Sequence, residues 1–166
     1  MRLETKRLRI RDLTEEDAGF VLRLVTDEAF IEYIADKGIQ DIEGARAFLR
    51  DGSWTNPKRP GHGMFGLELR SEARTLIGIG GILYRETLDE TDVGYALLPE
   101  FRGRGFAFEA AEALIGYGRS DLGAERIVGL TAPDNTASIR TLEKLGMRFE
   151  RNVKMSDDDP GTQLYA

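Results

Sequence analysis

The sequence predicts one domain of mixed α/β type, with a mixed, mostly antiparallel central sheet of about six to seven strands flanked by helices. Three strand-like segments follow one another with short connections, as in an antiparallel meander. Farther along, a strand, a helix and a strand succeed one another, which implies a right-handed parallel crossover. The length of 166 residues suits a single domain over residues 1–166, without an internal repeat or linker.

The N-terminal segment predicts a strand followed by helices. Residues 7–11 alternate charged and apolar side chains, as a half-buried strand near a sheet edge does. Thr14 is suited to cap a helix, because its hydroxyl can accept a bond from a first-turn N–H and acidic residues follow it. An apolar cluster at residues 30–34 predicts a second short helix, and Asp41 is suited to cap a third.

Residues 51–63 predict a loop, since two prolines and three glycines interrupt any periodicity. This loop contains the only tryptophan and the only histidine of the chain, Trp54 and His62. Such a loop is either functional or a surface connection that Trp54 pins to the edge of the core, and the second interpretation is favoured. His62 is then expected to be a solvated loop residue.

The predicted meander covers residues 65–69, 75–84 and 92–98. The middle strand contains Gly78, Gly80 and Gly81, which is unusual because glycine weakens a strand. Either a ligand or another backbone approaches closely there, or the strand has a bulge or packs tightly under a helix. A bulge or tight packing is the favoured interpretation.

A glycine-rich turn, residues 102–105, joins the third strand of the meander to a helix that begins near Phe106 and stops at Gly123. The first N–H groups of a helix lack internal partners, its dipole is positive there, and glycine lets an anion come close. The turn therefore predicts a phosphate or pyrophosphate pocket, and a simple connection is the alternative. No Lys-Ser/Thr pair follows Gly105, so the turn is not a Walker A loop.

The C-terminal part predicts a strand over residues 126–131, a short helix that stops at Gly146, and two last strands over residues 147–153 and 162–166. Asn135 can cap the short helix.

Composition excludes several classes of site. The chain has no cysteine, so it has no disulfide, thiolate metal site or cysteine nucleophile, and one histidine excludes a His-rich metal site. The formal net charge of −6 disfavours nucleic acid as a partner. No apolar run reaches the roughly 18 residues of a membrane span. Charges without a following apolar segment at the N-terminus argue against a signal peptide, so a cytoplasmic location is expected.

Residues 102–107, which follow the Leu97-Leu98-Pro99 step, resemble the R/Q-x-x-G-x-G/A motif of the GNAT acetyltransferases. Asn135-x-x-Ser138, followed by Leu-Glu-Lys-Leu-Gly-Met, is similar to the second coenzyme A motif of that family. The opening over residues 4–17 resembles the branch that contains the ribosomal-protein N-terminal acetyltransferases. Three motifs in the family's order span nearly the whole chain.

The resemblance implies a GNAT-like domain with a splayed V between its central strands, and acetyl-CoA as the acyl donor without a metal. In the family, the pyrophosphate lies on backbone N–H groups of the turn, and the pantetheine arm pairs along the splayed strand edge like an added strand. The residues implied to bind the cofactor are Ala96, Leu97, Arg102, Gly103, Arg104, Gly105, Phe106, Ala107, Asn135 and Ser138.

The implied reaction moves an acetyl group to a primary amine, of a protein N-terminus or a small molecule, by direct attack in a ternary complex. Asp92 is a candidate base because relatives often carry an acid on that strand, although it is more readily explained as a turn residue. Many relatives have a tyrosine where this chain has Leu142, so Ser138 becomes the best-placed proton donor.

Leu142 also keeps open a non-catalytic acyl-CoA-binding or regulatory domain, and an unrelated nucleotide-binding α/β domain is a third reading. The expected partners are acetyl-CoA and an amine acceptor, with no nucleic acid and no membrane. The protein is expected to act as a monomer or homodimer, and the acceptor to lie between the N-terminal helices and residues 51–63.

Overall fold

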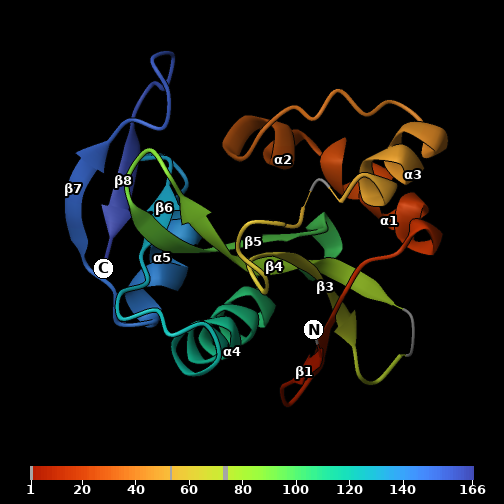
Figure 1. The fold of residues 1–166 in the computed structure, drawn as a ribbon, viewed down its shortest axis with the longest axis horizontal. Helices are drawn as coiled ribbons and strands as arrows, with labels where there is room; N and C mark the ends of the chain where they lie inside the picture. The colour runs from red at the N-terminus through yellow and green to blue at the C-terminus, as the bar shows by residue number, and fades with distance from the viewer. Residues whose placement is uncertain (1, 53, 73–74) are drawn as a thin grey trace.

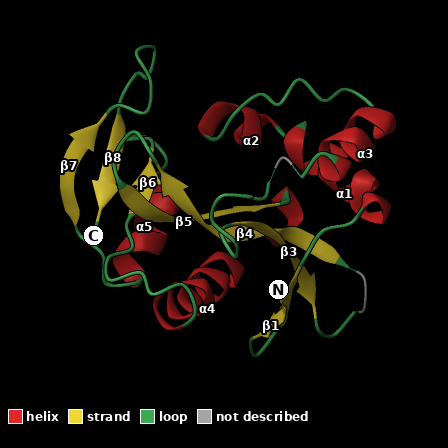
Figure 2. Ribbon diagram, in the orientation of Figure 1, coloured by secondary structure: helices red, strands yellow, loops and turns green. Residues whose placement is uncertain are grey.

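In a computed structural model, which describes residues 2–52, 54–72 and 75–166, the chain forms one mixed α/β unit with two sheets (Figures 1 and 2). The larger sheet is antiparallel in the order β1-β2-β3-β4-β5, and the smaller has the order β6-β8-β7. The strands are β1 (Arg2–Glu4), β2 (Leu8–Arg11), β3 (Gly63–Leu69), β4 (Leu76–Arg85), β5 (Glu90–Leu97), β6 (Gly129–Thr131), β7 (Phe149–Val153) and β8 (Thr162–Tyr165). The α-helices are α1 (Ala18–Val25), α2 (Glu28–Tyr33), α3 (Ile42–Arg50), α4 (Phe106–Ser120) and α5 (Thr136–Lys144), with 3-10 turns η1 (Glu15–Asp17) and η2 (Pro99–Phe101).

Helices cover both faces of the larger sheet. Successive side chains of a strand point to opposite faces, so β4 supplies both layers. Ile79 is buried in the cluster that α1, α2 and α3 form on one face. Gly80 lies on the other face, beneath Leu114 of α4. The expected mixed α/β class is confirmed, and the described strands are two sheets rather than one sheet of six to seven strands. No described helix is both long and apolar enough to span a membrane.

Close packing explains the glycines of β4. A Cβ atom at Gly80 would lie 2.9 Å from Leu114 Cδ1, and one at Gly81 would lie 1.8 Å from the carbonyl oxygen of Gly63. Neither position has room for a side chain. Gly80 thus shows the predicted tight packing under a helix, whereas Gly81 shows the alternative, the close approach of another backbone.

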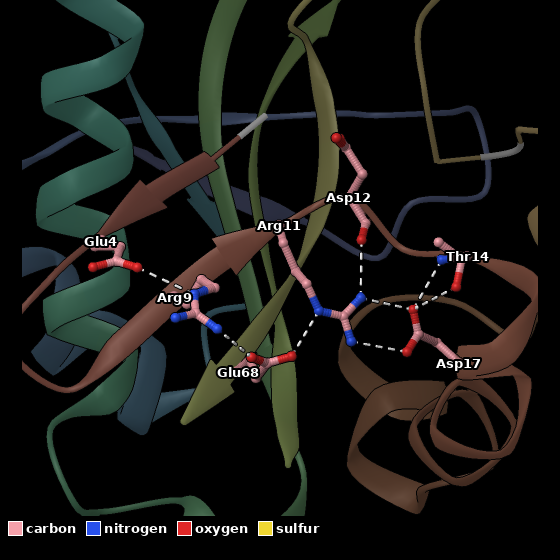
Figure 3. A network of polar contacts seen from close by, with 7 residues as sticks. All are labelled: Glu4, Arg9, Arg11, Asp12, Thr14, Asp17 and Glu68. Carbon is pink, nitrogen blue, oxygen red and sulfur yellow. Dashed lines mark hydrogen bonds and ion pairs between the residues drawn. The ribbon is translucent and has the colours of Figure 1, made fainter. Parts of the chain in front are cut away.

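A network of ion pairs joins the edge of the larger sheet to the N-terminal helices (Figure 3). The carboxylate of Glu68, on β3, accepts from Arg9 Nη1 at 3.1 Å and from Arg11 Nε at 2.7 Å. Arg11 also donates to both oxygens of Asp17, each at 2.9 Å. Thr14 is the N-cap, as expected, but of the 3-10 helix η1, and its N–H donates to Asp17 at 2.8 Å.

The two sheets meet at one point, where β5 and β6 run parallel. Val93 N donates to the Val128 carbonyl at 2.9 Å, and Val128 N donates to the Thr91 carbonyl at 2.8 Å. Beyond this bridge β6 pairs with β8 instead of β5. The strand expected over residues 126–131 therefore begins only at Gly129, and the parallel crossover consists of this short contact, after which the two strands separate.

The loop over residues 51–63 is anchored at two places in its described part. Trp54 packs edge-on against Phe48 of α3, with ring centroids 4.9 Å apart, as expected of a pinned surface connection. Gly61 accepts from the hydroxyl of Tyr117 on α4 at 3.2 Å, so the C-terminal half lies on the face opposite α1–α3. The two halves are bonded to each other, since Asn56 N donates to the His62 carbonyl at 3.2 Å and Met64 N donates to the Trp54 carbonyl at 2.8 Å. The prediction that His62 is solvated is wrong, because it is half-buried and its Nδ1 is buried without a hydrogen-bond partner among the described residues.

Candidate active site

The glycine-rich turn lies at the N-terminus of α4 and is exposed. Gly103 and Gly105 have φ of +71° and +79°, the left-handed region that glycine enters without a Cβ penalty. Gly105 is the N-cap of α4, a helix of 15 residues whose aligned peptide dipoles favour an anion at this end. The next residue, Phe106, is buried and anchors the helix on the sheet, while Ala107 is half-buried. These residues fit a phosphate group.

One side of the turn is held by Arg7 and Glu109. Arg7 Nη1 donates to the Arg104 carbonyl at 2.9 Å, and the guanidinium stacks 4.2 Å from the centroid of Phe106. Glu109 in turn accepts from Arg7 Nε at 2.6 Å, from Arg7 N at 2.7 Å and from the Thr5 hydroxyl at 2.6 Å. Burial opposes ionisation, but these donors keep the pKa of Glu109 below its ordinary value. The negative charge of Glu109, in the first turn of α4, is thereby neutralised by Arg7, and the ion pair supports one side of the turn.

The other side of the turn is held by Arg102. Its Nε donates to the Leu97 carbonyl at 3.0 Å, at the end of β5. Its Nη2 pairs with Asp27, whose carboxylate also caps α2 by accepting from Phe30 N. The turn is therefore fixed between the end of β5 and the start of α2.

Hydrogen-bond direction along β5 decides which residues face the opening next to β6. Leu98 N donates to the Ile77 carbonyl of the neighbouring strand, so even-numbered residues such as Ala96 direct their backbone groups toward β4. Val93 N bonds Val128, so odd-numbered residues direct theirs toward β6. Leu97 and Tyr95 thus direct backbone groups toward the side of β6, although the Leu97 carbonyl already accepts from Arg102 Nε. Ala96, which was also expected to pair with the pantetheine arm, directs its backbone groups toward β4.

Asn135 and Ser138 lie across the opening, at the start of α5. Asn135 is the N-cap, and its side-chain oxygen accepts from Ser138 N at 3.2 Å, as expected. Ser138 Oγ is 3.3 Å from the hydroxyl of Tyr95 on β5. Leu142, one turn later, is fully buried against β6, so it contributes packing rather than a polar group.

Asp92 is not brought together with Ser138. It is one of the even-numbered residues of β5, so its side chain points to the face opposite Tyr95. Only 2% of Asp92 is exposed, and its carboxylate accepts from Arg85 Nε at 2.5 Å and from Nη2 at 3.4 Å. Burial raises its pKa, although Arg85 opposes the shift. Asp92 therefore forms an ion pair beside the bridge between β5 and β6, away from the hydroxyl of Ser138.

Comparisons with known proteins identify this arrangement. Residues 7–148 match the model of an acetyltransferase (GNAT) domain. The chain belongs to the GNAT acetyltransferase family. It is 31% identical to the N-acetyltransferase YnaD of Bacillus subtilis over 152 residues, which are 90% of this chain and 84% of YnaD. It is also 31% identical to YoaA of the same organism, over 89% of this chain and 83% of YoaA.

Solved structures of acetyltransferases share the fold. A GNAT acetyltransferase from Bacillus anthracis superposes with a TM-score of 0.80 at 26% identity, covering 99% of this chain and 96% of that one. RimL, a ribosomal L7/L12 α-N-protein acetyltransferase solved in complex with coenzyme A, superposes with a TM-score of 0.80 at 18% identity, over 99% and 96% of the two chains. This acetyltransferase is thus an acyltransferase of GNAT fold. No group of His, Cys, Asp or Glu that could hold a metal occurs among its described residues.

Sequence reasoning missed Tyr95 and the role of Arg7. Tyr95 was visible only as an apolar position in the alternation of β5, whose register directs its hydroxyl toward α5. Arg7 and Glu109 are 102 residues apart, so local spacing does not indicate that they pair.

Proposed function

We propose that this acetyltransferase takes the acetyl group from acetyl-CoA and transfers it to a primary amine by direct attack in a ternary complex. The observation that carries the proposal is that β5 and β6 stop pairing beyond the Val93–Val128 bridge, with the glycine turn after β5 and Ser138 in the first turn of α5. Turn residues 102–107 would hold the pyrophosphate, and Leu97, Tyr95 and Asn135 the pantetheine arm. Family membership and a similar fold in a coenzyme A complex support this assignment.

The chemistry follows from the charges that develop. The neutral amine attacks the thioester carbonyl, the carbon–sulfur bond breaks, and one proton passes from nitrogen to the departing sulfur. A thiolate with an ordinary pKa of about 8.5 leaves readily, so a hydrogen bond from the Ser138 hydroxyl suffices to stabilise it. Much of the acceleration comes from holding amine and thioester together.

In this proposal Asp92 takes up the proton that an ammonium acceptor must lose before it attacks, and does so only through water, because its carboxylate is buried. Its raised pKa brings it toward the range in which a carboxylate takes up a proton.

A screen of amines with acetyl-CoA, measured as release of the free thiol, tests the reaction. We expect release with at least one class of amine, and calorimetric binding of acetyl-CoA in preference to ATP. Binding without release for every amine would support the non-catalytic acyl-CoA-binding alternative, which Leu142 and the closed Asp92 favour. Binding of ATP but not of acetyl-CoA would contradict both.

A further inference from the structure

A tyrosine hydroxyl lies beside Ser138 without a role in the reaction as described. Tyr95 Oη is 3.3 Å from Ser138 Oγ and 3.4 Å from the Ser138 carbonyl oxygen. The ring packs among the side chains between the sheet and α4. Burial raises the pKa of Tyr95, so the phenol keeps its proton at neutral pH and can donate it to a hydrogen bond.

The contact crosses the opening that the cofactor is proposed to enter. Tyr95 comes from β5 and Ser138 from the first turn of α5, and these elements separate beyond the Val93–Val128 bridge. Ser138 is also fixed by its N–H, which Asn135 Oδ1 accepts at 3.2 Å. Asn135 therefore fixes the backbone of Ser138, and Tyr95 contacts its hydroxyl oxygen.

We propose that Tyr95 is a positioning residue for Ser138, an inference that rests on the proposed function. Two acceptors lie within reach of the one phenol proton, the Ser138 carbonyl oxygen and Ser138 Oγ. In this proposal Tyr95 donates to Oγ, which leaves the single proton of the serine hydroxyl free to point at the departing sulfur. Tyr95 transfers no proton, because the ordinary pKa of a phenol, about 10, lies above that of the thiol, about 8.5. The pair acts as a chain of two hydrogen bonds, in which each strengthens the next.

Binding of coenzyme A and of desulfo-coenzyme A, which lacks the sulfur, tests this chain by calorimetry at pH 7 and pH 9. In the wild-type protein the affinity for coenzyme A should rise with pH relative to desulfo-coenzyme A, because the bound thiolate accepts from Ser138. Tyr95→Phe should lower that rise about threefold to tenfold, the loss of one hydrogen bond, without changing the affinity for desulfo-coenzyme A. Turnover should show lower kcat at unchanged KM for acetyl-CoA.

Two further variants separate positioning from packing. Ser138→Ala should show at least the same loss, and the double variant no greater loss than Ser138→Ala alone, since Tyr95 acts through Ser138. Tyr117→Phe is the matched control, because its hydroxyl bonds the Gly61 carbonyl outside the opening, and it should behave as the wild type.

The inference is overturned if Tyr95→Phe keeps the full pH-dependent rise and kcat, or if it loses desulfo-coenzyme A as well. A wild-type protein that binds neither ligand would instead remove the proposed function itself.

Discussion

Substitution of Gly105 by alanine tests the glycine turn as the phosphate site. Gly105 has φ of +79°, so a Cβ there costs roughly 1–2 kcal/mol of backbone strain. The new methyl would also stand at the N-terminus of α4, against the position proposed for the pyrophosphate. Its nearest neighbour would be Arg7 Nη2 at 3.4 Å, an ordinary contact, so the fold has room for it. The methyl group would, however, displace the pyrophosphate from the helix N-terminus. Loss of one charge-assisted hydrogen bond, about 1.5–3 kcal/mol, lowers the affinity for acetyl-CoA roughly 10–100-fold.

Gly123→Ala is the matched control, because Gly123 has φ of +68° and open space around its missing Cβ. It follows the other end of α4, whose 15 residues make a helix about 22 Å long. Urea unfolding should show similar losses of stability for the two variants, whereas calorimetry should show loss of acetyl-CoA binding for Gly105→Ala alone. Unchanged affinity in Gly105→Ala, or equal loss in Gly123→Ala, would refute the assignment of the phosphate site.

Three further predictions concern charged groups. Glu109→Gln removes the charge that holds Arg7. It should lower the free energy of unfolding by about 1 kcal/mol and weaken acetyl-CoA binding severalfold in calorimetry. An unchanged affinity would mean that the Arg7–Glu109 ion pair does not shape the turn. Because the pKa of Asp92 is raised in the folded protein, the wild type should lose free energy of unfolding as pH rises from 3.8 through that raised pKa. Asp92→Asn should lack this pH-dependent loss. Identical profiles of urea unfolding against pH for the two proteins would contradict this. Burial opposes ionisation of Asp17, but bonds from Arg11 and Thr14 outweigh it and lower the pKa of Asp17. Its contribution to the free energy of unfolding should therefore be present above pH 3.8 and be lost as pH falls through the lowered pKa. Asp17→Asn should lack this loss in acid, as urea unfolding against pH would show.

Features that depend on neighbouring residues could be predicted from the sequence. Gly105 and Asn135 act at helix starts, where the backbone requires a glycine or a capping side chain within a few residues. The burial of alternate residues in the meander follows equally from local periodicity. These features account for the fold class and for the position of the turn.

Features that depend on register or on distant contacts could not be predicted. Alternation indicates which side chains share a face, but not which sheet neighbour each backbone group meets, so Ala96 was named together with Leu97, and Tyr95 was not named. The acidity of Asp92 was visible, whereas its pairing with Arg85 depends on how β4 and β5 align. The pairing of β5 with β4 thus determines which backbone groups of β5 are free of β4 and which cation neutralises Asp92.

Arg102 links the glycine turn to the N-terminal helices. Its guanidinium joins the turn proposed for the donor phosphates to Asp27, and Asp27 is the residue on which α2 starts. A second ion pair, between Arg23 of α1 and Glu100 of η2 at 2.7 Å, runs beside the first. Two ion pairs therefore connect the two ends of the segment around the turn to α1 and α2, so a displacement of the turn would stretch contacts to both helices.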